Sequence, residues 1–367
     1  MKTSIVVGYG FGDEGKGNTV NWLSSQNPNT LVVRFNGGQQ AGHAVFHGGK
    51  FHEFASIGAG SLNGSHTFIS KYCTVFPSAF NVEWKKLQDI GVTPKVYVDP
   101  FAMVTTPFDV ESNRSFEVDH RHGSCGAGFG KTVWRHETLD HSHRIFVIDL
   151  LNHWILEQKL IQICKLYGGD ERLIKTFMKS CDEYLDKIGI VGEMEVFNLF
   201  DHVVFEGAQG ILLDRQHGIF PHVTRSNTTC KNAIEICQRN NLPKPDVYGI
   251  LRCYSTKHGN GPLKGECDMS DIDVVDEHPT NFTNDWQGKF RYAPFDFGLY
   301  EYSFHIDSQY FERYLNSHRM VITCFDHIKG DRLITTSGRI YKSTFKEMFP
   351  RGSIMVSSND FTNFEIV

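Results

Sequence analysis

Short runs of apolar residues that end at a glycine or a polar residue recur along the chain. Runs of this length that are apolar almost throughout are typical of strands buried on both faces of a parallel sheet. The pattern predicts strands at Ser4–Val7, Thr30–Phe35, Lys95–Val98, Ile145–Ile148, Val203–Phe205, Val247–Leu251 and Met320–Thr323.

Between some of these strands, apolar residues recur at helical spacing. The longest such segment is Leu150–Ile190, and shorter ones are Asn227–Arg239 and Gln309–Asn316. Strands that alternate with helices predict an α/β fold, with a mostly parallel central sheet and helices on both faces. No Pro- or Ser-rich linker divides the chain, so we expect residues 1–367 to form a single domain.

The composition excludes several classes of protein. Charged residues make up 22% and hydrophobic residues 40% of the chain, which is typical of a globular protein and not of a disordered one. A formal net charge of −5 gives no general attraction to nucleic acids or anionic membranes, so any phosphate must be bound at a local site. No segment approaches the ~20 apolar residues of a transmembrane helix. Nine cysteines without a C-x-x-C pair favour reduced thiols and a cytoplasmic location.

The first predicted strand leads directly into a phosphate-loop-like segment, Gly8-Tyr-Gly-Phe-Gly-Asp-Glu-Gly-Lys-Gly17. Gly10 to Lys16 fit the pattern G-x-x-x-x-G-K, in which backbone N–H groups converge on a phosphate at the positive end of a helix dipole. Gly17 stands where the usual Ser or Thr would hold Mg²⁺. Asp13 and Glu14 are unusual in such a loop, because a carboxylate beside a phosphate must bind the metal or move a proton.

Two further glycine-rich segments follow predicted strands. Arg34-Phe-Asn-Gly-Gly-Gln-Gln-Ala-Gly-His43 offers carboxamides for a purine or phosphate edge and a histidine that could donate a proton. A histidine in a loop is also commonly a plain surface residue, and this alternative stays open. Phe205-Glu-Gly-Ala-Gln-Gly-Ile-Leu-Leu-Asp214 lets the backbone approach a ligand, and Thr224-Arg-Ser-Asn-Thr228 adds hydroxyls and one guanidinium.

Together and in this order, these segments resemble the adenylosuccinate synthetase family. The resemblance is carried by Gly12-Asp-Glu-Gly-Lys-Gly17, Val33-Arg-Phe-Asn-Gly-Gly38 with Ala41-Gly-His43, Phe205-Glu-Gly-Ala-Gln-Gly210 and Val223-Thr-Arg-Ser-Asn-Thr228. Members of this family use Mg²⁺ and a nucleoside triphosphate to phosphorylate the 6-oxygen of a purine monophosphate, which the amine of aspartate then displaces. They complete their site across the two-fold axis of a homodimer.

The resemblance implies roles for particular residues. Asp13 would be the general base and, with the carbonyl of Gly42, a Mg²⁺ ligand, and His43 would be the acid at the 6-oxygen. The remaining residues would hold the substrates: the triphosphate by Gly12, Glu14, Gly15, Lys16, Gly17 and Asp326; the purine monophosphate by Gln40, Ser124, Cys125, Gly126, Gln209 and Thr224, with Arg135 as a compensating cation that could come from a dimer partner; and aspartate by Arg291 and Lys289.

Several positions depart from the common form of the family. Gln40 replaces Asn, and Cys125 and Ala127 replace Thr and Arg in the loop expected to hold the 5′-phosphate. Cys324 replaces the Lys of the segment that reads guanine, which favours ATP or dATP over GTP. The Arg-rich aspartate loop is reduced to Trp286–Asp296, and because that loop also touches the ribose 2′-hydroxyl, its reduction fits a deoxyribose substrate.

These departures resemble the phage and archaeal branch of the family, particularly the phage enzyme that acts on dGMP. The resulting hypothesis is a ligase that condenses L-aspartate with dGMP, using ATP, dATP or GTP, to form N6-succino-2-amino-2′-deoxyadenylate, ADP and phosphate for diaminopurine nucleotide synthesis. A phage-encoded enzyme would act in the host cytoplasm. The alternative is a ligase that uses IMP and GTP in AMP synthesis.

Two hypotheses from other classes are weaker. A nucleotide kinase would be expected to carry Ser or Thr at the position of Gly17. A nucleotide-binding regulator would need neither Asp13 nor His43.

Overall fold

The computed structural model describes residues 1–120, 123–275, 288–328, 332–342, 348–358 and 361–367. Ten of the strands in this part of the chain form one sheet in the order β18-β17-β14-β11-β1-β10-β2-β5-β7-β9. Their bounds are β1 (Lys2–Gly8), β2 (Thr30–Arg34), β5 (His66–Ile69), β7 (Val96–Val98), β9 (Ile188–Ile190), β10 (His202–Glu206), β11 (Asp246–Arg252), β14 (Ser317–Thr323), β17 (Ile354–Val356) and β18 (Phe364–Ile366).

Neighbouring strands of this sheet run parallel, except that β17 and β18 pair antiparallel. The longer helices that surround the sheet are α1 (Lys16–Ser25), α2 (Pro77–Asp89), α3 (Pro107–His120), α4 (Phe129–Thr138), α5 (His153–Tyr167), α6 (Arg172–Leu185), α8 (Lys231–Arg239) and α9 (Phe297–Phe311), with the short α7 (Glu193–Phe197). None of the helices that the structure describes has the length and apolar character needed to cross a membrane.

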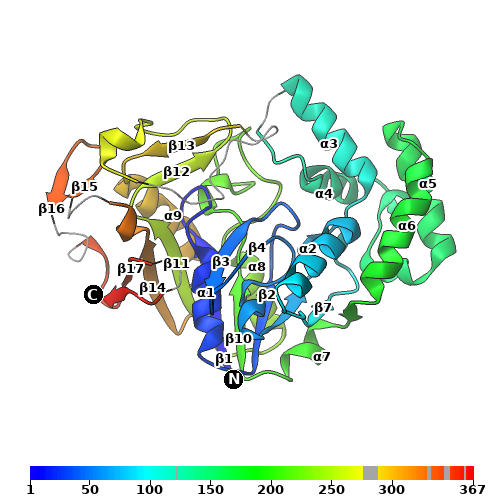
Figure 1. Cartoon of the computed structure of the whole chain (residues 1–367), viewed down its shortest axis with the longest axis horizontal. Helices are drawn as coiled ribbons and strands as arrows, with labels where there is room; N and C mark the ends of the chain where they lie inside the picture. Colours follow the sequence, from blue (N-terminus) through cyan, green and yellow to red (C-terminus); the bar gives the residue numbers. More distant parts are fainter. Residues whose placement is uncertain (121–122, 276–287, 329–331, 343–347, 359–360) are drawn as a thin grey trace.

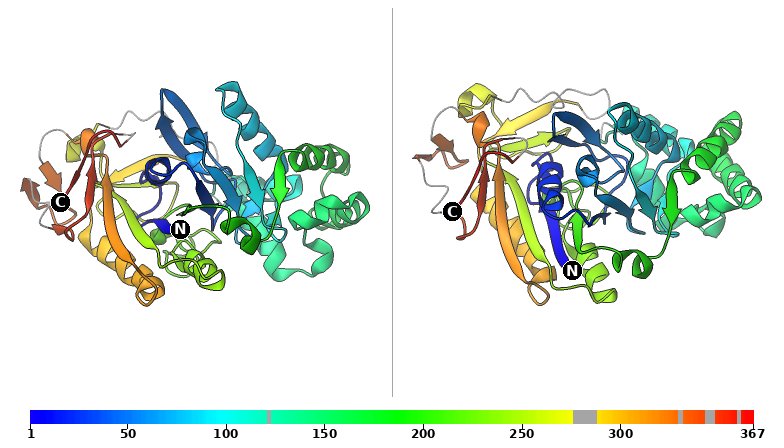
Figure 2. Two further views of the ribbon diagram at one scale, coloured as in Figure 1. Left: turned by 90° about the horizontal axis from the view of Figure 1, so that it is seen from below. Right: turned by 60° about the horizontal axis from the view of Figure 1, so that its bottom comes forward.

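Alternate residues of each central strand pack on opposite faces of the sheet, which explains the continuous apolar runs. On β1, Val6 belongs to an apolar cluster to which α1, α2, α5 and α6 contribute, whereas Ile5 and Val7 belong to a second cluster to which α7, α8 and α9 contribute. Figure 1 shows α3 to α6 gathered beyond the β7 end of the sheet, and the views in Figure 2 show α8 and α9 on the opposite side from α1. The predicted fold class, a mostly parallel sheet with helices on both faces, is confirmed.

Two-stranded ribbons stand outside the main sheet. They are β3 (His43–His47) with β4 (Lys50–Phe54), β6 (Thr74–Val75) with β8 (Met103–Val104), β12 (Ser255–His258) with β13 (Phe290–Ala293), and β15 (Arg332–Ile334) with β16 (Ile340–Lys342). His43, expected in a loop, is therefore the first residue of a strand. The β3–β4 and β12–β13 ribbons each bring functional side chains to the site described below.

Some local predictions were wrong. The strand predicted at Ile145–Ile148 is reduced to one bridge between Phe146 and Met103, and a 3₁₀ turn follows at Val147–Leu151. The helical pattern of Leu150–Ile190 divides into α5, α6 and β9, because Gly168 ends α5 in a left-handed conformation (φ 64°). The helix predicted at Gln309–Asn316 begins much earlier, where Asp296 accepts the Leu299 N–H as an N-cap, and it ends at Phe311.

Candidate active site

One cavity of about 1330 Å³ lies where the carboxyl ends of several parallel strands meet. It is lined by the segments that follow β1, β2, β10, β11 and β14, together with α4 and the β12 strand. The order of the sheet reverses at β1, whose neighbours β10 and β11 both come much later in the chain. Ligands of open α/β sheets bind in this type of crevice, outside the carboxyl ends of the strands.

Unusual backbone conformations gather around this cavity. Asp13, Gln209, Cys324 and Phe361 all line it, and all have positive φ angles of 56°, 59°, 67° and 59° although none is glycine. Such conformations cost of order 1–3 kcal/mol each and persist where the surrounding structure holds them for a function. The backbone conformations therefore indicate a functional site at this cavity, independently of the sequence motifs.

The phosphate loop joins β1 to α1, as the sequence predicts. Glu14, however, folds back into the loop: its Oε1 accepts the N–H groups of Gly10 (2.5 Å) and Gly12 (3.3 Å), and its Oε2 lies 3.2 Å from the Lys16 Nζ. Burial raises the pKa of Glu14, and Lys16 opposes that rise. Two of the amides expected to face a phosphate thus bind a carboxylate. Helix α1 begins beyond them at Lys16, and its N-cap residue, Gly15, provides no side-chain cap.

Gly17 has a steric role. A Cβ atom at this position would lie 2.7 Å from the Cβ of His43 and 3.1 Å from the Cγ2 of Val45. The first turn of α1 and the start of β3 are therefore in contact through this glycine. The hydroxyl residue of an ordinary phosphate loop is sterically incompatible with the place that His43 takes.

His43 is held by a buried carboxylate on the central sheet. Its Nδ1 lies 2.5 Å from the Oε1 of Glu206, whose Oε2 accepts the N–H of Ala59 (3.0 Å). Burial lowers the pKa of His43, and the contact with Glu206 opposes this. Burial alone would raise the pKa of Glu206, but the Arg34 cation and the His43 ring hold it below its usual value. A charged Glu206 fixes the ring, so that Nε2 remains for a group in the cavity.

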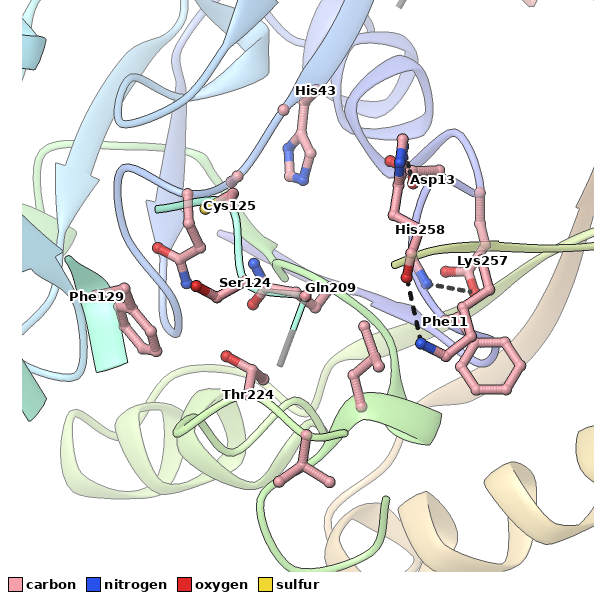
Figure 3. A pocket seen from close by; sticks show the side chains of 18 of the residues that line it. Phe11, Asp13, His43, Ser124, Cys125, Phe129, Gln209, Thr224, Lys257 and His258 are labelled. Atoms are coloured by element: carbon pink, nitrogen blue, oxygen red, sulfur yellow. Dashed lines mark hydrogen bonds and ion pairs between the residues drawn. The ribbon is translucent and has the colours of Figure 1, made fainter. Parts of the chain in front are cut away.

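Asp13, the other carboxylate of the phosphate loop, also lines the cavity. Its Oδ2 lies 3.3 Å from the Nε2 of His258, and its backbone carbonyl accepts the Arg252 Nε–H. His258 packs edge-on against Phe290, with ring centroids 4.6 Å apart. Figure 3 shows Asp13 and His258 on one side of the cavity, with His43 nearby and also directed into it. Asp13 and His43 therefore face one cavity.

The oxygen atoms near Asp13 suit Mg²⁺, which prefers carboxylate and carbonyl ligands. Gly42 lines the same cavity, and a Cβ built on it would lie 2.7 Å from the Oε1 of Glu53. Among the described residues, no group of three or more His, Cys, Asp or Glu side chains is placed to hold a metal ion. The residues fit a Mg²⁺ ion that is held partly by substrate phosphates, as this ion commonly is.

The carboxamides of Gln40 and Gln209 both belong to residues that line the cavity. Within the described part of the chain, Nε2 and Oε1 of Gln40 and Oε1 of Gln209 are buried without a hydrogen-bond partner. A Cβ atom on Gly37 would lie 3.2 Å from the Gln40 amide and 3.4 Å from the Gln209 Oε1, so the two side chains lie close together. A buried polar group without a hydrogen-bond partner costs about 1–3 kcal/mol of stability. This indicates that a polar ligand supplies the missing hydrogen bonds.

Ser124, Cys125 and Thr224 line the side of the cavity opposite Asp13, and Figure 3 shows them there with Phe129. Gly126 does not line the cavity. It forms part of the turn, with its carbonyl accepting the Arg114 Nε–H (3.2 Å). The residues that the sequence assigns to the triphosphate and the metal all line the cavity, and their roles stay predictions: Gly12, Glu14, Gly15, Lys16, Gly17, Gly42 and Asp326.

The prediction for Arg135 was wrong. Its side chain is completely buried, and its Nε and Nη2 bind the two carboxylate oxygens of Asp109 at 2.9 and 2.8 Å. The same Nη2 also donates to the carbonyl of Val104 (2.8 Å). Because these contacts hold the Arg135 guanidinium in the core of its own chain, it reaches neither this cavity nor that of a dimer partner.

The structure also does not place Arg291 or Lys289 in the cavity. Arg291 donates to the carbonyls of Gly259 and Gly261, both at 2.8 Å, and pairs with Glu266. These bonds occupy the guanidinium that the sequence assigns to aspartate. Trp286 and Gln287 of the predicted aspartate loop lie outside the described residues.

Several residues that the structure brings to the site have no role in the sequence motifs described above. Glu206 ends β10, directly before the glycines of its segment. Lys257 and His258 end β12, and the glycine-rich stretch of Gly259 and Gly261 follows them. Charged residues beside a glycine-rich strand end are therefore the sequence signal that points to this pair.

Comparisons with known proteins point to one family. Residues 5–329 match the family model described as adenylosuccinate synthetase. An adenylosuccinate synthetase of Chlorobaculum parvum is 32% identical over 287 residues, which are 72% of this chain and 64% of that protein. The chain thus spans less than two-thirds of that relative.

Two solved structures share the fold. The fully ligated adenylosuccinate synthetase of Plasmodium falciparum superposes with a TM-score of 0.74 at 18% identity, covering 100% of this chain and 87% of that one. The succinoaminodeoxyadenylate synthetase of cyanophage S-2L, bound to dGMP and dATP, superposes with a TM-score of 0.62 at 14% identity. The superposition covers 93% of this chain and 95% of that one.

Proposed function

The chain belongs to the adenylosuccinate synthetase family, and from this premise we propose that it is a ligase that joins L-aspartate to a 6-oxopurine monophosphate at the expense of a nucleoside triphosphate. The observation that carries the proposal is that Asp13, His43 and the phosphate loop all face one cavity. A proton acceptor, a proton donor and an anion site in one cavity are what phosphorylation of a purine oxygen requires.

In the first step, the Asp13 carboxylate takes the proton from N1 of the purine, and the 6-oxygen attacks the γ-phosphorus as the nucleoside diphosphate leaves. His43 donates a hydrogen bond from Nε2 to the 6-oxygen, where negative charge develops, while Glu206 holds the other ring nitrogen. His258 keeps the Asp13 carboxylate in place. Lys16 neutralises charge on the transferred phosphoryl group.

In the second step, the amine of aspartate attacks C6, and the phosphoryl group leaves as inorganic phosphate. The carboxylates of aspartate need cations near Asp13, and the cavity offers Lys257 and Arg252 there. The Lys257 Nζ is oriented by the carbonyls of His258 (3.2 Å) and Asn260 (2.5 Å). Mg²⁺, held by Asp13 and the Gly42 carbonyl, would neutralise phosphate charge when bound.

We propose dGMP as the purine monophosphate and ATP or dATP as the donor, with IMP and GTP as the alternative. Cys324 lines the cavity where a lysine would favour GTP. The cyanophage protein of similar fold, which binds dGMP and dATP, supports this choice. The adenylosuccinate synthetases matched by sequence support the alternative. The cytoplasmic location and the homodimer stay predictions.

The test combines the purified chain with Mg²⁺, aspartate, one monophosphate (dGMP or IMP) and one triphosphate (ATP, dATP or GTP). Product absorbance and phosphate release are recorded for each pair. We expect a succino product with dGMP, and turnover only with IMP would select the alternative. Phosphate transfer that does not need aspartate would identify a kinase. Triphosphate binding without phosphate release would identify a regulator.

A further inference from the structure

The side of the cavity that faces the predicted 5′-phosphate lacks the cation assigned to it. Gln40, Ser124, Cys125 and Thr224 contribute amide, hydroxyl and thiol groups, and Arg135 is buried elsewhere. A phosphate monoester carries close to two negative charges at neutral pH, and protein sites that bind one firmly use charge-assisted hydrogen bonds. Other positive groups must therefore be sought on this wall.

Lys131 lines this part of the cavity from the first turn of α4. Its Nζ lies over the Phe116 ring, 4.9 Å from the ring centroid. In the part of the chain that the structure describes, no carboxylate oxygen lies within salt-bridge distance of this ammonium. Burial lowers the pKa of Lys131, the positive charge of Arg225 lowers it further, and Asp109 opposes this. Lys131 and Arg225 are thus two cations that line the same cavity.

Arg225 is the second cation, and it directly follows Thr224 on the loop that lines the cavity. Its Nη1 lies 3.5 Å from the Oε2 of Glu137, a carboxylate that Arg215 also contacts at 2.5 Å. Because Glu137 also pairs with Arg215 and lies at the longer distance from Arg225, the Arg225 guanidinium retains N–H donors for a ligand. An anion placed between Lys131 and Arg225 would relieve their mutual repulsion.

The start of α4 adds a third favourable feature. Gly128 precedes the helix with φ 81°, no side chain caps it, and its first turn holds no acidic residue. The positive end of the helix dipole therefore faces the same side of the cavity as Ser124 and Phe129 in Figure 3. Glu117, which also lines the cavity, has its Oε2 bonded to the N–H of Gly123 (2.8 Å).

We propose that Lys131 and Arg225 are residues of this chain that bind the phosphate of the purine monophosphate. The assignment rests on the proposed function, because it takes the cavity to hold a mononucleotide. The phosphate lies between the two cations, and the hydroxyls of Ser124 and Thr224 donate to its remaining oxygens.

The test measures equilibrium binding by calorimetry, without turnover. The ligands are dGMP, IMP and the corresponding nucleosides deoxyguanosine and inosine, which lack the phosphate. Lys131→Met keeps the apolar stem over Phe116 and removes the charge, and Lys131→Arg keeps the charge. Lys179→Met on α6 is the matched control, because that ammonium is exposed and lies outside the cavity.

Loss of one charge-assisted hydrogen bond is expected to raise the Kd of the bound mononucleotide by about 10- to 100-fold. Nucleoside binding should not change, Lys131→Arg should restore most of the affinity, and Arg225→Gln should behave like Lys131→Met. Equal mononucleotide binding by Lys131→Met and the unsubstituted chain would overturn this assignment and leave the proposed function standing. Failure of the unsubstituted chain to bind either mononucleotide would overturn both.

Discussion

Substitution of Gly17 by Ser provides a sharp test of the site, because it would restore the residue that an ordinary phosphate loop uses to hold Mg²⁺. If this were an ordinary phosphate loop, Gly17→Ser should maintain or raise activity. The structure predicts the opposite result. The new Cβ would lie 2.7 Å from the Cβ of His43, where carbon atoms normally keep about 3.5–4.0 Å. His43 must then move by roughly 1 Å.

The size of the effect follows from this displacement. A misplacement of about 1 Å in a catalytic group costs on the order of 10²-fold in rate. Overpacking of a buried contact costs about 1–3 kcal/mol of folding stability, and this is partly offset because glycine is a poor helix residue. We therefore expect kcat to fall about 100-fold, with a smaller decrease in the free energy of unfolding.

The assay compares initial rates of succino-product formation at saturating substrates, with urea unfolding measured in parallel. Gly192→Ser is the control: a Cβ atom there meets nothing within 4 Å, and the residue is the N-cap of α7, a position that serine favours. This variant should keep its activity and its stability. A Gly17→Ser protein that turns over as fast as the unsubstituted chain would refute the proposed contact between α1 and His43.

Three further predictions follow. Asp13→Asn should lower kcat by about 10²- to 10⁴-fold, the usual contribution of a general base, and change triphosphate binding little; normal turnover would remove Asp13 from this role. Glu206→Gln should lower kcat at least about tenfold with little change in KM, because the His43 ring loses its charged partner; an unchanged pH–rate profile would contradict this. Burial raises the pKa of Asp307 from 3.8 to about 6. Between about pH 4 and pH 6 the native state thus binds more protons than the unfolded state. The free energy of unfolding should therefore fall by up to ~3 kcal/mol as the pH rises through this range. In Asp307→Asn, the free energy of unfolding, measured with urea, should depend less on pH in this range. A pH dependence equal to that of the unsubstituted chain would show that Asp307 is not its source.

Much of the fold could be predicted because the central strands are buried on both faces, and the sequence shows this directly. Thr30–Arg34 and His202–Glu206 are buried throughout and read as continuous apolar runs ending at polar residues. The peripheral elements were harder to predict. The aromatic-rich helix α9 has apolar residues all round, and its start depends on the Asp296 cap, so spacing alone placed it wrongly.

The sequence by itself determined which chemical groups are present and that the phosphate loop, the Gln40–His43 segment and the Gln209 segment each follow a predicted strand. Parallel strands bring their carboxyl ends to one edge of the sheet, and these segments meet there. Only the tertiary structure decided which long side chains reach that edge. Arg135 and Arg291 have the charge that an anion site needs, but Asp109 and Glu266 pair with them elsewhere. His258 and Lys131 carry no motif, yet folding brings both to the cavity. A guanidinium or an ammonium binds whichever partner the packing puts within about 3 Å, and that choice depends on contacts between residues far apart in the chain.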